Sequence, residues 1–536
     1  MKNSLFLISG LLCLFILSCS KQIEKADPFE MVECNISSHI GVPFGMNLWR
    51  IPNDGQVGIT GFTQSHHLEG NSDYGRFCLM PVTSKTTLPF ETQNMEELEL
   101  TPSYIKTKLP DQNVTVELAA GDRASMFKIS YENTDSAFLI VDVPEDGSHV
   151  SINKRENRVE GFATAVGTEF PTDFRNYFII KLDCPIVSSE SISVENHPRM
   201  LLHLQCTAKE PVYARVSSSF ISAEQAERNL EEVNCDFNTV RENGNTLWND
   251  ALGRITVQGN SKADENKFYT SLAKSLVEIR KAYEFDESGV PVHYSPYNGM
   301  ICKGYMYHNI ATNVSDKSLL SLLSLLYPTE MGKIQESVLN IYNESGADNI
   351  KIDASILADA YIKGIKISDT DMLWEAATHG LNIEDQSELA TPYYNWCIYR
   401  IGEKLGKSDA ELSIYAKHAL EFDNGHGELR NFDPPSRDML AKSESADYVF
   451  SALGFYPLCQ GSSQYVIGAP IVKFAEINLE NGKKITINTR NQNENNLYVK
   501  DLEMNGNKYQ NNFLTHSDLV NGADIIFWMS ENPIES

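Results

Sequence analysis

Hydrophobic and polar residues alternate along much of the stretch from residue 31 to residue 235, with turn-forming residues between the short runs. An alternation of period two predicts β-strands, because successive side chains of a strand point to opposite faces. Short strands at intervals of about a dozen residues are typical of a β-sandwich. The clearest runs are residues 114–118, 126–129, 138–141, 177–182 and 201–205.

The pattern changes to helical spacing after residue 268, where apolar residues recur at intervals of three and four. This spacing predicts amphipathic helices that each bury one face. Because several such helices follow one another, we expect them to pack helix on helix in one domain. The predicted helices cover residues 317–327, 331–342, 354–362, 393–405 and 410–420.

The stretch 443–479 predicts one more helix, a sharp stop and the start of a small β unit. Tyr448, Ala452 and Phe455 fall on one helical stripe. Gly454 is suited to a left-handed C-cap, and the proline that follows soon after it prevents the helix from continuing. The residues alone predict that the stretch 443–479 contains a buried helix that packs on a terminal sheet.

Two Asn-Gly pairs predict hairpin turns in this last unit. The first, Asn481-Gly482, stands between alternating runs that contain Ile477 and Ile485, and the second is Asn505-Gly506. A two-residue turn of this kind needs positive φ at both central residues, which asparagine and glycine tolerate. We therefore expect both residues of each pair in the left-handed region.

The N-terminus predicts export. Lys2 precedes an apolar run from Leu5 to Leu17, which reads as a signal peptide because it is short for a membrane span. The Leu-Ser-Cys sequence ending at Cys19 resembles a bacterial lipobox, which implies that Cys19 is lipidated and becomes the first residue of the mature chain. This predicts a protein anchored by its lipid to a cell envelope membrane, facing the periplasm or the cell surface. The alternative is an ordinary signal peptide that happens to hold a cysteine.

The chain of 536 residues carries a formal net charge of −27, with a pI near 4.9. Strong acidity argues against nucleic acid and against docking on an anionic membrane surface, since both need a basic face. A neutral glycan is indifferent to this charge. The eight cysteines after Cys19 are scattered without any Cys-x-x-Cys pair. Buried thiols are the favoured interpretation, with one or two disulfides as the alternative in an exported protein.

The amino-acid sequence of several stretches resembles that of glycoside hydrolase family 92, a family of bacterial, calcium-dependent exo-α-mannosidases. The C-terminal part contributes YVFSALGFYPLC, QYVIGAP and NGNKY…FLTHSDLVNGADIIF. Earlier segments at 42–46 and 61–75 carry the same resemblance, and 224–249 resembles the helical linker of the family. The resemblance implies a sandwich domain followed by a toroid of paired helices.

We therefore predict an α+β fold, with an N-terminal antiparallel β-sandwich, a shortened (α/α) toroid-like helical domain and a small C-terminal β unit. The helical domain is expected to be shortened because about 200 residues are tight for the twelve helices of a full toroid. The predicted divisions are a lipoprotein signal peptide at 1–19, the sandwich at 29–222, linker helices at 223–250, the helical domain at 251–458 and the C-terminal unit at 459–536.

The resemblance also implies an inverting mechanism, in which one carboxyl group protonates the leaving oxygen and another activates water from the opposite face. Alignment with the family's Gly-Asn-Glu-Thr motif places Glu344 at the position of the acid, although this stretch matches an earlier helix of the family equally well. Leu440 stands at the position of the base, and Asp438 and Glu444 are displaced from it. Glu344, Asp438 and Glu444 are the remaining candidates for catalysis.

Two further family segments are altered. The segment that grips the terminal mannose, Trp-Asp-Thr-Phe-Arg in the family, corresponds to Asn-Val-Ser-Asp-Lys at 313–317. The motif with calcium-ligating residues, Gly-Asn-Glu-Pro-Ser-His-His, has no counterpart in the sequence, and no other run supplies six to eight oxygen ligands at calcium spacing. We therefore predict no metal site and no cofactor, although calcium is expected for the family.

A glycine-containing loop carries His66 and His67 and is followed by Asp73. The family has two histidines one residue apart in this loop, and the first becomes Gln64 here. Histidines in such a loop can line a sugar site by hydrogen bonding, so His66, His67 and Asp73 are the predicted substrate-binding residues. Adjacent histidines alone are a poor metal signal because their ring vectors diverge.

Three hypotheses for function follow. The first is a non-catalytic or impaired relative that binds an α-mannose-containing glycan, because acid, base, calcium and sugar-gripping segments are altered together. The second is an active exo-α-mannosidase that uses relocated carboxylates. The third is a structural or decayed family member without a ligand.

Overall fold

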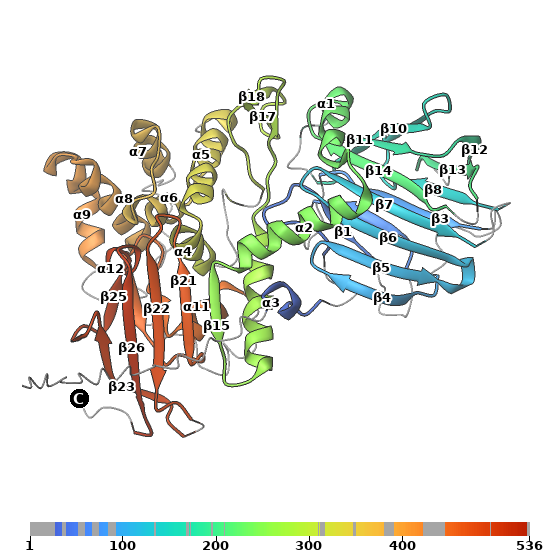
Figure 1. Ribbon diagram of the computed structural model, residues 1–536. Helices are drawn as coiled ribbons and strands as arrows, with labels where there is room; N and C mark the ends of the chain where they lie inside the picture. The colour runs from blue at the N-terminus through green and yellow to red at the C-terminus, as the bar shows by residue number, and fades with distance from the viewer. Residues whose placement is uncertain are drawn as a thin grey trace, which may run out of the picture.

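The computed structural model describes residues 27–34, 39–51, 59–66, 74–83, 93–132, 136–167, 171, 173–193, 197–207, 210–308, 310, 317–346, 350–379, 391–421, 445–493 and 495–532. The predicted lipidation site Cys19 and the predicted site residues His67, Asp73, Asp438 and Glu444 lie outside these ranges, as does Leu440. A two-sheet domain forms one side of the molecule, and the helices with a C-terminal sheet form the other, with α2 (Phe237–Leu252) running between them (Figure 1).

The N-terminal domain is an antiparallel β-sandwich of a six-stranded and an eight-stranded sheet. The six-stranded sheet has the order β1 (Leu48–Arg50), β2 (Phe62–Ser65), β3 (Phe77–Val82), β8 (Phe138–Asp142), β13 (Arg199–Leu204) and β12 (Ile186–Ser191). The other has the order β4 (Glu96–Thr101), β5 (Tyr104–Leu109), β6 (Val114–Ala120), β7 (Ala124–Tyr131), β14 (Val212–Ser219), β11 (Arg175–Leu182), β10 (Arg158–Thr164) and β9 (His149–Asn153). All five strands predicted from alternation are present.

Alternation along β11 shows why the eight-stranded sheet is covered on both faces. Phe178 and Ile180 point into the core between the two sheets. Ile179 points the other way, into a small cluster with α1 (Ala223–Asn229), η3 (Leu230–Val233) and α2. The outer face of this sheet is therefore buried under the segment that leads into the helical region.

The five predicted helices are also confirmed, and their ends follow local chemistry. Ser261 caps α3 (Lys262–Glu278) with a reciprocal capping box to Asp264, and Pro328 opens α5 (Pro328–Ser345), where its missing N–H costs nothing. The other helices of this region are α4 (Lys317–Leu326), α6 (Ala354–Ile362), α7 (Thr370–His379), α8 (Thr391–Leu405) and α9 (Asp409–Glu421).

A three-stranded sheet lies inside the region that the sequence predicts as helical. It consists of β16 (Glu284–Phe285), β17 (Pro291–Tyr294) and β18 (Ile301–Lys303), and it stands beside α5 on the side facing the sandwich (Figure 1). Strands of two to four residues are too short to carry a recognisable alternation. The sequence pattern therefore gives no sign of this sheet.

The C-terminal unit begins with α11 (Ala446–Leu453), and Gly454 ends it at φ 90°, as predicted for a left-handed C-cap. Phe455 is not part of the helix but begins β19 (Phe455–Pro457), because the cap turns the chain one residue earlier. The larger sheet here has the order β15 (Ile255–Gln258), β21 (Phe474–Asn478), β22 (Lys484–Arg490), β26 (Ala523–Ser530), β23 (Tyr498–Met504) and β24 (Asn507–Lys508). A smaller sheet joins β19 with β20 (Gln464–Ile467) and β25 (Phe513–Thr515), beside α12 (His516–Val520).

The two Asn-Gly pairs behave differently. Asn505 and Gly506 have φ of 53° and 76°, so this two-residue turn is confirmed. At the first pair only Gly482 has positive φ, and the prediction for Asn481 is wrong. The backbone N–H of Leu479 donates to the carbonyl of Lys483 at 2.9 Å, which closes a longer loop in which Asn481 keeps an ordinary conformation.

No helix within the described ranges is long and apolar enough to cross a membrane. The eight cysteines in those ranges are free thiols. Cys184, Cys397 and Cys459 are buried, whereas Cys235 is exposed.

A buried ion pair joins the helical region to the C-terminal signature. Asp359 and Lys363, one turn apart on α6, are fully buried, with Lys363 Nζ 2.5 Å from Asp359 Oδ1 and 2.6 Å from the hydroxyl oxygen of Ser321. Asp359 also accepts the backbone N–H of Gly461 at 3.3 Å. Burial lowers the pKa of Lys363, and the adjacent carboxylate opposes that effect.

Removing one member of this pair should destabilise the protein strongly, because it leaves the other charge buried without a partner. We expect Lys363→Met to lower the free energy of unfolding by about 3–5 kcal/mol. The control is Lys108→Met, which removes an exposed pair with Glu132 and should cost about 0.5 kcal/mol or less. Scanning calorimetry compares the variants, and equal losses would contradict this account.

Candidate functional site

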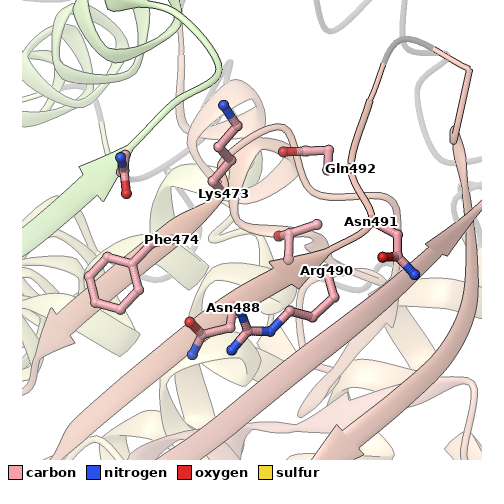
Figure 2. A pocket seen from close by; sticks show the side chains of 8 residues that line it. Lys473, Phe474, Asn488, Arg490, Asn491 and Gln492 are labelled. Atoms are coloured by element: carbon pink, nitrogen blue, oxygen red, sulfur yellow. The ribbon is translucent and has the colours of Figure 1, made fainter. Parts of the chain in front are cut away.

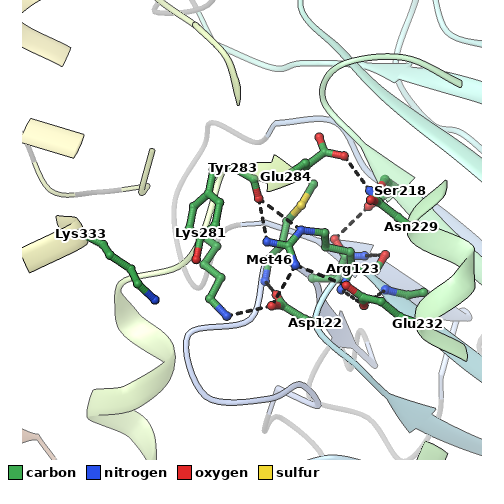
Figure 3. A network of polar contacts seen from close by, with 12 residues as sticks. Met46, Asp122, Arg123, Ser218, Asn229, Glu232, Lys281, Tyr283, Glu284 and Lys333 are labelled. Carbon is green, nitrogen blue, oxygen red and sulfur yellow. Dashed lines mark hydrogen bonds and ion pairs between the residues drawn. The ribbon is translucent and has the colours of Figure 1, made fainter. Parts of the chain in front are cut away.

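The sandwich and the helical region meet around the guanidinium group of Arg123, which is 5% exposed. Its Nε and Nη2 donate to the carbonyl oxygen of Tyr283 at 3.2 and 2.9 Å. Its Nη1 lies 3.1 Å from Asp122 Oδ2 and 3.3 Å from Glu232 Oε1 (Figure 3). One side chain of the β6–β7 turn therefore holds both η3 and the segment that leads into β16.

Asp122 is the anion at the centre of this junction. It accepts the backbone N–H of Met46 at 2.9 Å, and Lys281 Nζ lies 2.8 Å from it (Figure 3). Burial alone would raise the pKa of this carboxyl group, but the charges of Arg123 and Lys281 outweigh it and hold the pKa well below its usual range.

Glu284 is a second buried carboxylate of the junction, on β16. It accepts hydrogen bonds from the Ser219 hydroxyl at 2.9 Å, the Phe220 backbone N–H at 2.9 Å and the Asn229 amide at 2.6 Å. Burial raises its pKa despite these donors. All three donors belong to the end of the sandwich or to α1, so Glu284 anchors the short sheet on the sandwich side.

His66 lies in this junction, fully buried. Its Nε2 is 2.9 Å from the side-chain nitrogen of Gln64, and its Nδ1 is 3.1 Å from the carbonyl oxygen of Met46. An amide nitrogen only donates and a carbonyl oxygen only accepts, so these contacts specify a neutral ring with its proton on Nδ1. His66 therefore joins the end of β2 to the backbone at Met46 from inside the core.

Aromatic rings surround His66 at the junction. The His66 ring centre is 4.7 Å from that of Phe220, and the Tyr74 ring centre is 3.8 Å from that of His308. Phe174 contacts both Tyr74 and Phe220. Sequence reasoning did not identify His308, Phe174 or Phe220, because they come from three distant segments with no shared pattern.

The predicted acid Glu344 lies in the last turn of α5, and its side chain is 7% exposed. His293 Nε2, on β17, is 2.9 Å from Glu344 Oε1. The three potential ligand atoms of His293, Cys302 and Glu344 lie within 4.8 Å of one another. The structure therefore places Glu344 beside a histidine and a thiol.

The carboxylates described at the junction do not fit a calcium site. Calcium binds six to eight oxygen atoms, several of them from carboxylates or carbonyls. Asp122 is already neutralised by Lys281 and Arg123, and Glu284 is held by three donors of the sandwich and α1. The calcium of the family has no set of ligands among these residues.

A separate shallow hollow lies on the C-terminal sheet, at the ends of β21 and β22 (Figure 2). Its lining is polar apart from one aromatic ring and contains no acidic residue; it consists of Gln258, Lys473, Phe474, Asn488, Thr489, Arg490, Asn491 and Gln492. Without a carboxyl group it lacks the acid and base that glycoside hydrolysis usually needs.

Two family models match the sequence over most of its length. Residues 32–223 match the glycosyl hydrolase family 92 N-terminal domain, and residues 225–391 and 443–531 match the glycosyl hydrolase family 92 catalytic domain. The chain therefore belongs to glycosyl hydrolase family 92. No curated protein matches the sequence.

Solved structures of the same family share the fold. The family 92 inverting mannosidase BT2199 from Bacteroides thetaiotaomicron VPI-5482 is 22% identical, with 95% of this chain and 97% of that chain covered and a TM-score of 0.83. The family 92 α-mannosidase BT3965 from Bacteroides thetaiotaomicron, solved in complex with mannoimidazole, is 18% identical, with 95% of each chain covered and a TM-score of 0.81. The family 92 glycosyl hydrolase ccman5 is 14% identical, with 95% and 98% covered and a TM-score of 0.77.

The Asp122 cluster generates a pH-dependent prediction. The pKa of Asp122 is lower in the folded protein than the value of about 3.9 expected when unfolded, so its contribution is fully present above about pH 5. That contribution is lost as the pH falls through the folded-state pKa. We expect Asp122→Asn to lower the free energy of unfolding by roughly 2 kcal/mol at pH 7, and by progressively less below pH 4.

Denaturant unfolding of both proteins between neutral and acidic pH measures this difference. An equal deficit at every pH would contradict the charge-based account. The Asn side chain still accepts the Met46 N–H, so the loss reports mainly on charge.

Proposed function

We propose that this member of family 92 binds α-mannose-containing glycans and has lost most or all hydrolase activity. The burial of Glu344 carries the proposal. A general acid must come within hydrogen-bond reach of the leaving oxygen of the sugar. A carboxylate that is 7% exposed and 2.9 Å from His293 has its reactive side taken up by the protein.

The remaining family positions support the same conclusion. Leucine occupies the position of the base at residue 440, and the calcium motif has no counterpart in the sequence. The two parts of the catalytic-domain match are separated by residues 392–442, a stretch that includes Asp438. Loss of a general acid or base typically lowers a rate by about 10²–10⁴-fold, so combined losses leave little transition-state stabilisation.

Retention of the scaffold supports binding. A family 92 α-mannosidase solved in complex with mannoimidazole shares this fold over 95% of the chain, so the scaffold that holds that ligand there is kept here. His67 and Asp73 follow His66 in the sequence and remain predicted substrate-binding residues. A neutral mannoside is also compatible with the strong net negative charge.

An assay of mannose release tests the proposal. Purified protein is incubated with α-linked mannobioses of each linkage, with added calcium or with a chelator. We expect mannose release by this protein at the level of the buffer blank in both conditions. An active family 92 mannosidase assayed alongside should release mannose only when calcium is present. Glu344→Gln is the matched variant, and it should be indistinguishable from the parent.

Two results would decide against the proposal. Calcium-dependent release by the parent, abolished in Glu344→Gln, would identify an active enzyme with Glu344 as its acid. Release that persists in Glu344→Gln would identify an enzyme that uses other carboxylates.

We further propose that the protein is exported and anchored to a cell envelope membrane through lipid on Cys19. The apolar run that ends in Leu-Ser-Cys supports this. Growth of the expressing bacterium with an alkyne-tagged fatty acid should label the parent protein and leave Cys19→Ala unlabelled. Equal labelling of both proteins would contradict lipidation at Cys19.

A further inference from the structure

A histidine and a cysteine of the short sheet face a glutamate at the end of a helix. In the β17–β18 pair, His293 is directly opposite Cys302. Directly opposed residues have their side chains on the same face of a sheet, with Cβ atoms about 4.5–5.5 Å apart. Glu344 approaches this face from the last turn of α5. The three side chains thus converge from three elements, β17, β18 and α5.

The hydrogen bonds of His293 leave a specific problem. Its Nδ1 is 3.0 Å from the carbonyl oxygen of Gly304, which only accepts, so Nδ1 carries a proton. Its Nε2 is 2.9 Å from a carboxylate oxygen, which also only accepts when ionised. A neutral ring would therefore place two lone pairs against each other. A proton on the ring or on the carboxyl group removes this repulsion, and so does a metal ion between the two atoms.

The surroundings have the features of a metal site. The contact between Nδ1 and a backbone carbonyl is the usual way in which proteins orient a ligating histidine. The second carboxylate oxygen of Glu344 is buried, and the Cys302 thiol lies within hydrogen-bond reach of this carboxylate. The C-terminal end of a helix, where Glu344 lies, carries partial negative charge and favours a cation.

We propose that His293, Cys302 and Glu344 bind a zinc ion that fastens the β17–β18 hairpin to the end of α5. Imidazole nitrogen, thiolate sulfur and carboxylate oxygen are the ligand types that zinc takes in proteins. Calcium and magnesium prefer oxygen ligands alone, so this mixed set disfavours them. Three protein ligands leave a fourth position for water.

The distances are close to those required. Zinc at about 2.0–2.2 Å from nitrogen and oxygen, with tetrahedral angles, separates those two atoms by about 3.3–3.5 Å. His293 Nε2 and Glu344 Oε1 are 2.9 Å apart, so they must open by only about 0.4–0.6 Å. All three ligand atoms already lie within 4.8 Å of one another, which sets the scale of the movement.

The charges of the zinc ion and of its proposed ligands also balance. A zinc ion with a neutral imidazole, one thiolate and one carboxylate forms a site without net charge. Burial and the Glu344 charge raise the pKa of the Cys302 thiol, and a bound metal ion would oppose this by stabilising the thiolate.

Gly304 explains how the hairpin is shaped for this contact. Its φ is 107°, and a Cβ atom there would lie 2.7 Å from the side-chain nitrogen of Asn340 on α5. Glycine thus lets the chain lie close to the helix and present its carbonyl to His293. Met300 and Ile301, at the start of β18, are each 59% exposed.

Direct metal binding tests the inference. The full-length chain, purified without a histidine tag, is stripped with a chelator and titrated with zinc against a chromogenic competitor. We expect one zinc ion per chain, and at least about a hundred-fold weaker binding for Cys302→Ser and Glu344→Gln. Cys235→Ser, which removes an exposed cysteine, is the matched control and should bind as the parent does.

Cobalt gives a second readout that reports the thiolate itself. The cobalt-loaded parent and Cys235→Ser should show a sulfur-to-cobalt charge-transfer band that Cys302→Ser lacks. Circular dichroism of the stripped variants shows whether each one is folded. If Cys302→Ser does not fold, Glu344→Gln still tests the site. Zinc binding of the parent no tighter than that of both variants, or a thiolate band that persists in Cys302→Ser, would overturn the site.

Discussion

The need to satisfy one buried guanidinium group organises the meeting of the two halves of this protein. Arg123 sits at the β6–β7 turn of the sandwich, and its donors are taken by the Tyr283 carbonyl and by Glu232 and Asp122. A buried charge without partners is very costly, so this side chain restricts how η3 and the segment at 281–285 can lie. Glu284, the residue after Tyr283, accepts hydrogen bonds from Ser219 and Phe220 at the end of the sandwich. The β16–β18 sheet, and with it His293, is positioned by these two residues.

The same constraint explains how the family scaffold is held together by residues other than those that would act on a sugar. The Arg123 cluster and the Asp359–Lys363 pair depend on residues that hold elements together, and neither requires a free carboxyl group facing a sugar. The carboxylate of Glu344 faces a histidine of the neighbouring sheet.

Local patterns were sufficient to predict most elements, and long-range contacts were not. The alternation in residues 177–182 and the helical spacing in 331–342 each reflect a single buried face, so a short window contains the information. Gly454 and Asn505 were predicted correctly because their conformations depend on neighbouring residues. Asn481 was predicted wrongly because a bond between Leu479 and Lys483 decides the loop.

In the candidate site, too, some residues could be located from the sequence, whereas their long-range contacts could not. The resemblance to the family located Glu344 and His66, and the structure adds what surrounds them. His293 is 51 residues from Glu344 in the sequence, on a strand too short to recognise. Arg123 and Tyr283 are 160 residues apart, and no pattern within either segment indicates that they meet. Partners of this kind are determined by packing of whole domains.

We propose that the mannosidase scaffold of this chain holds its sugar without cleaving it. Saturation-transfer NMR on one sample of protein and α-linked mannobiose measures both the binding of the sugar and its cleavage. We predict transfer of saturation to the mannose protons, while the anomeric signals of the intact disaccharide keep their intensity over time. The growth of free mannose signals, or the absence of any transfer across the set of linkages, would contradict it.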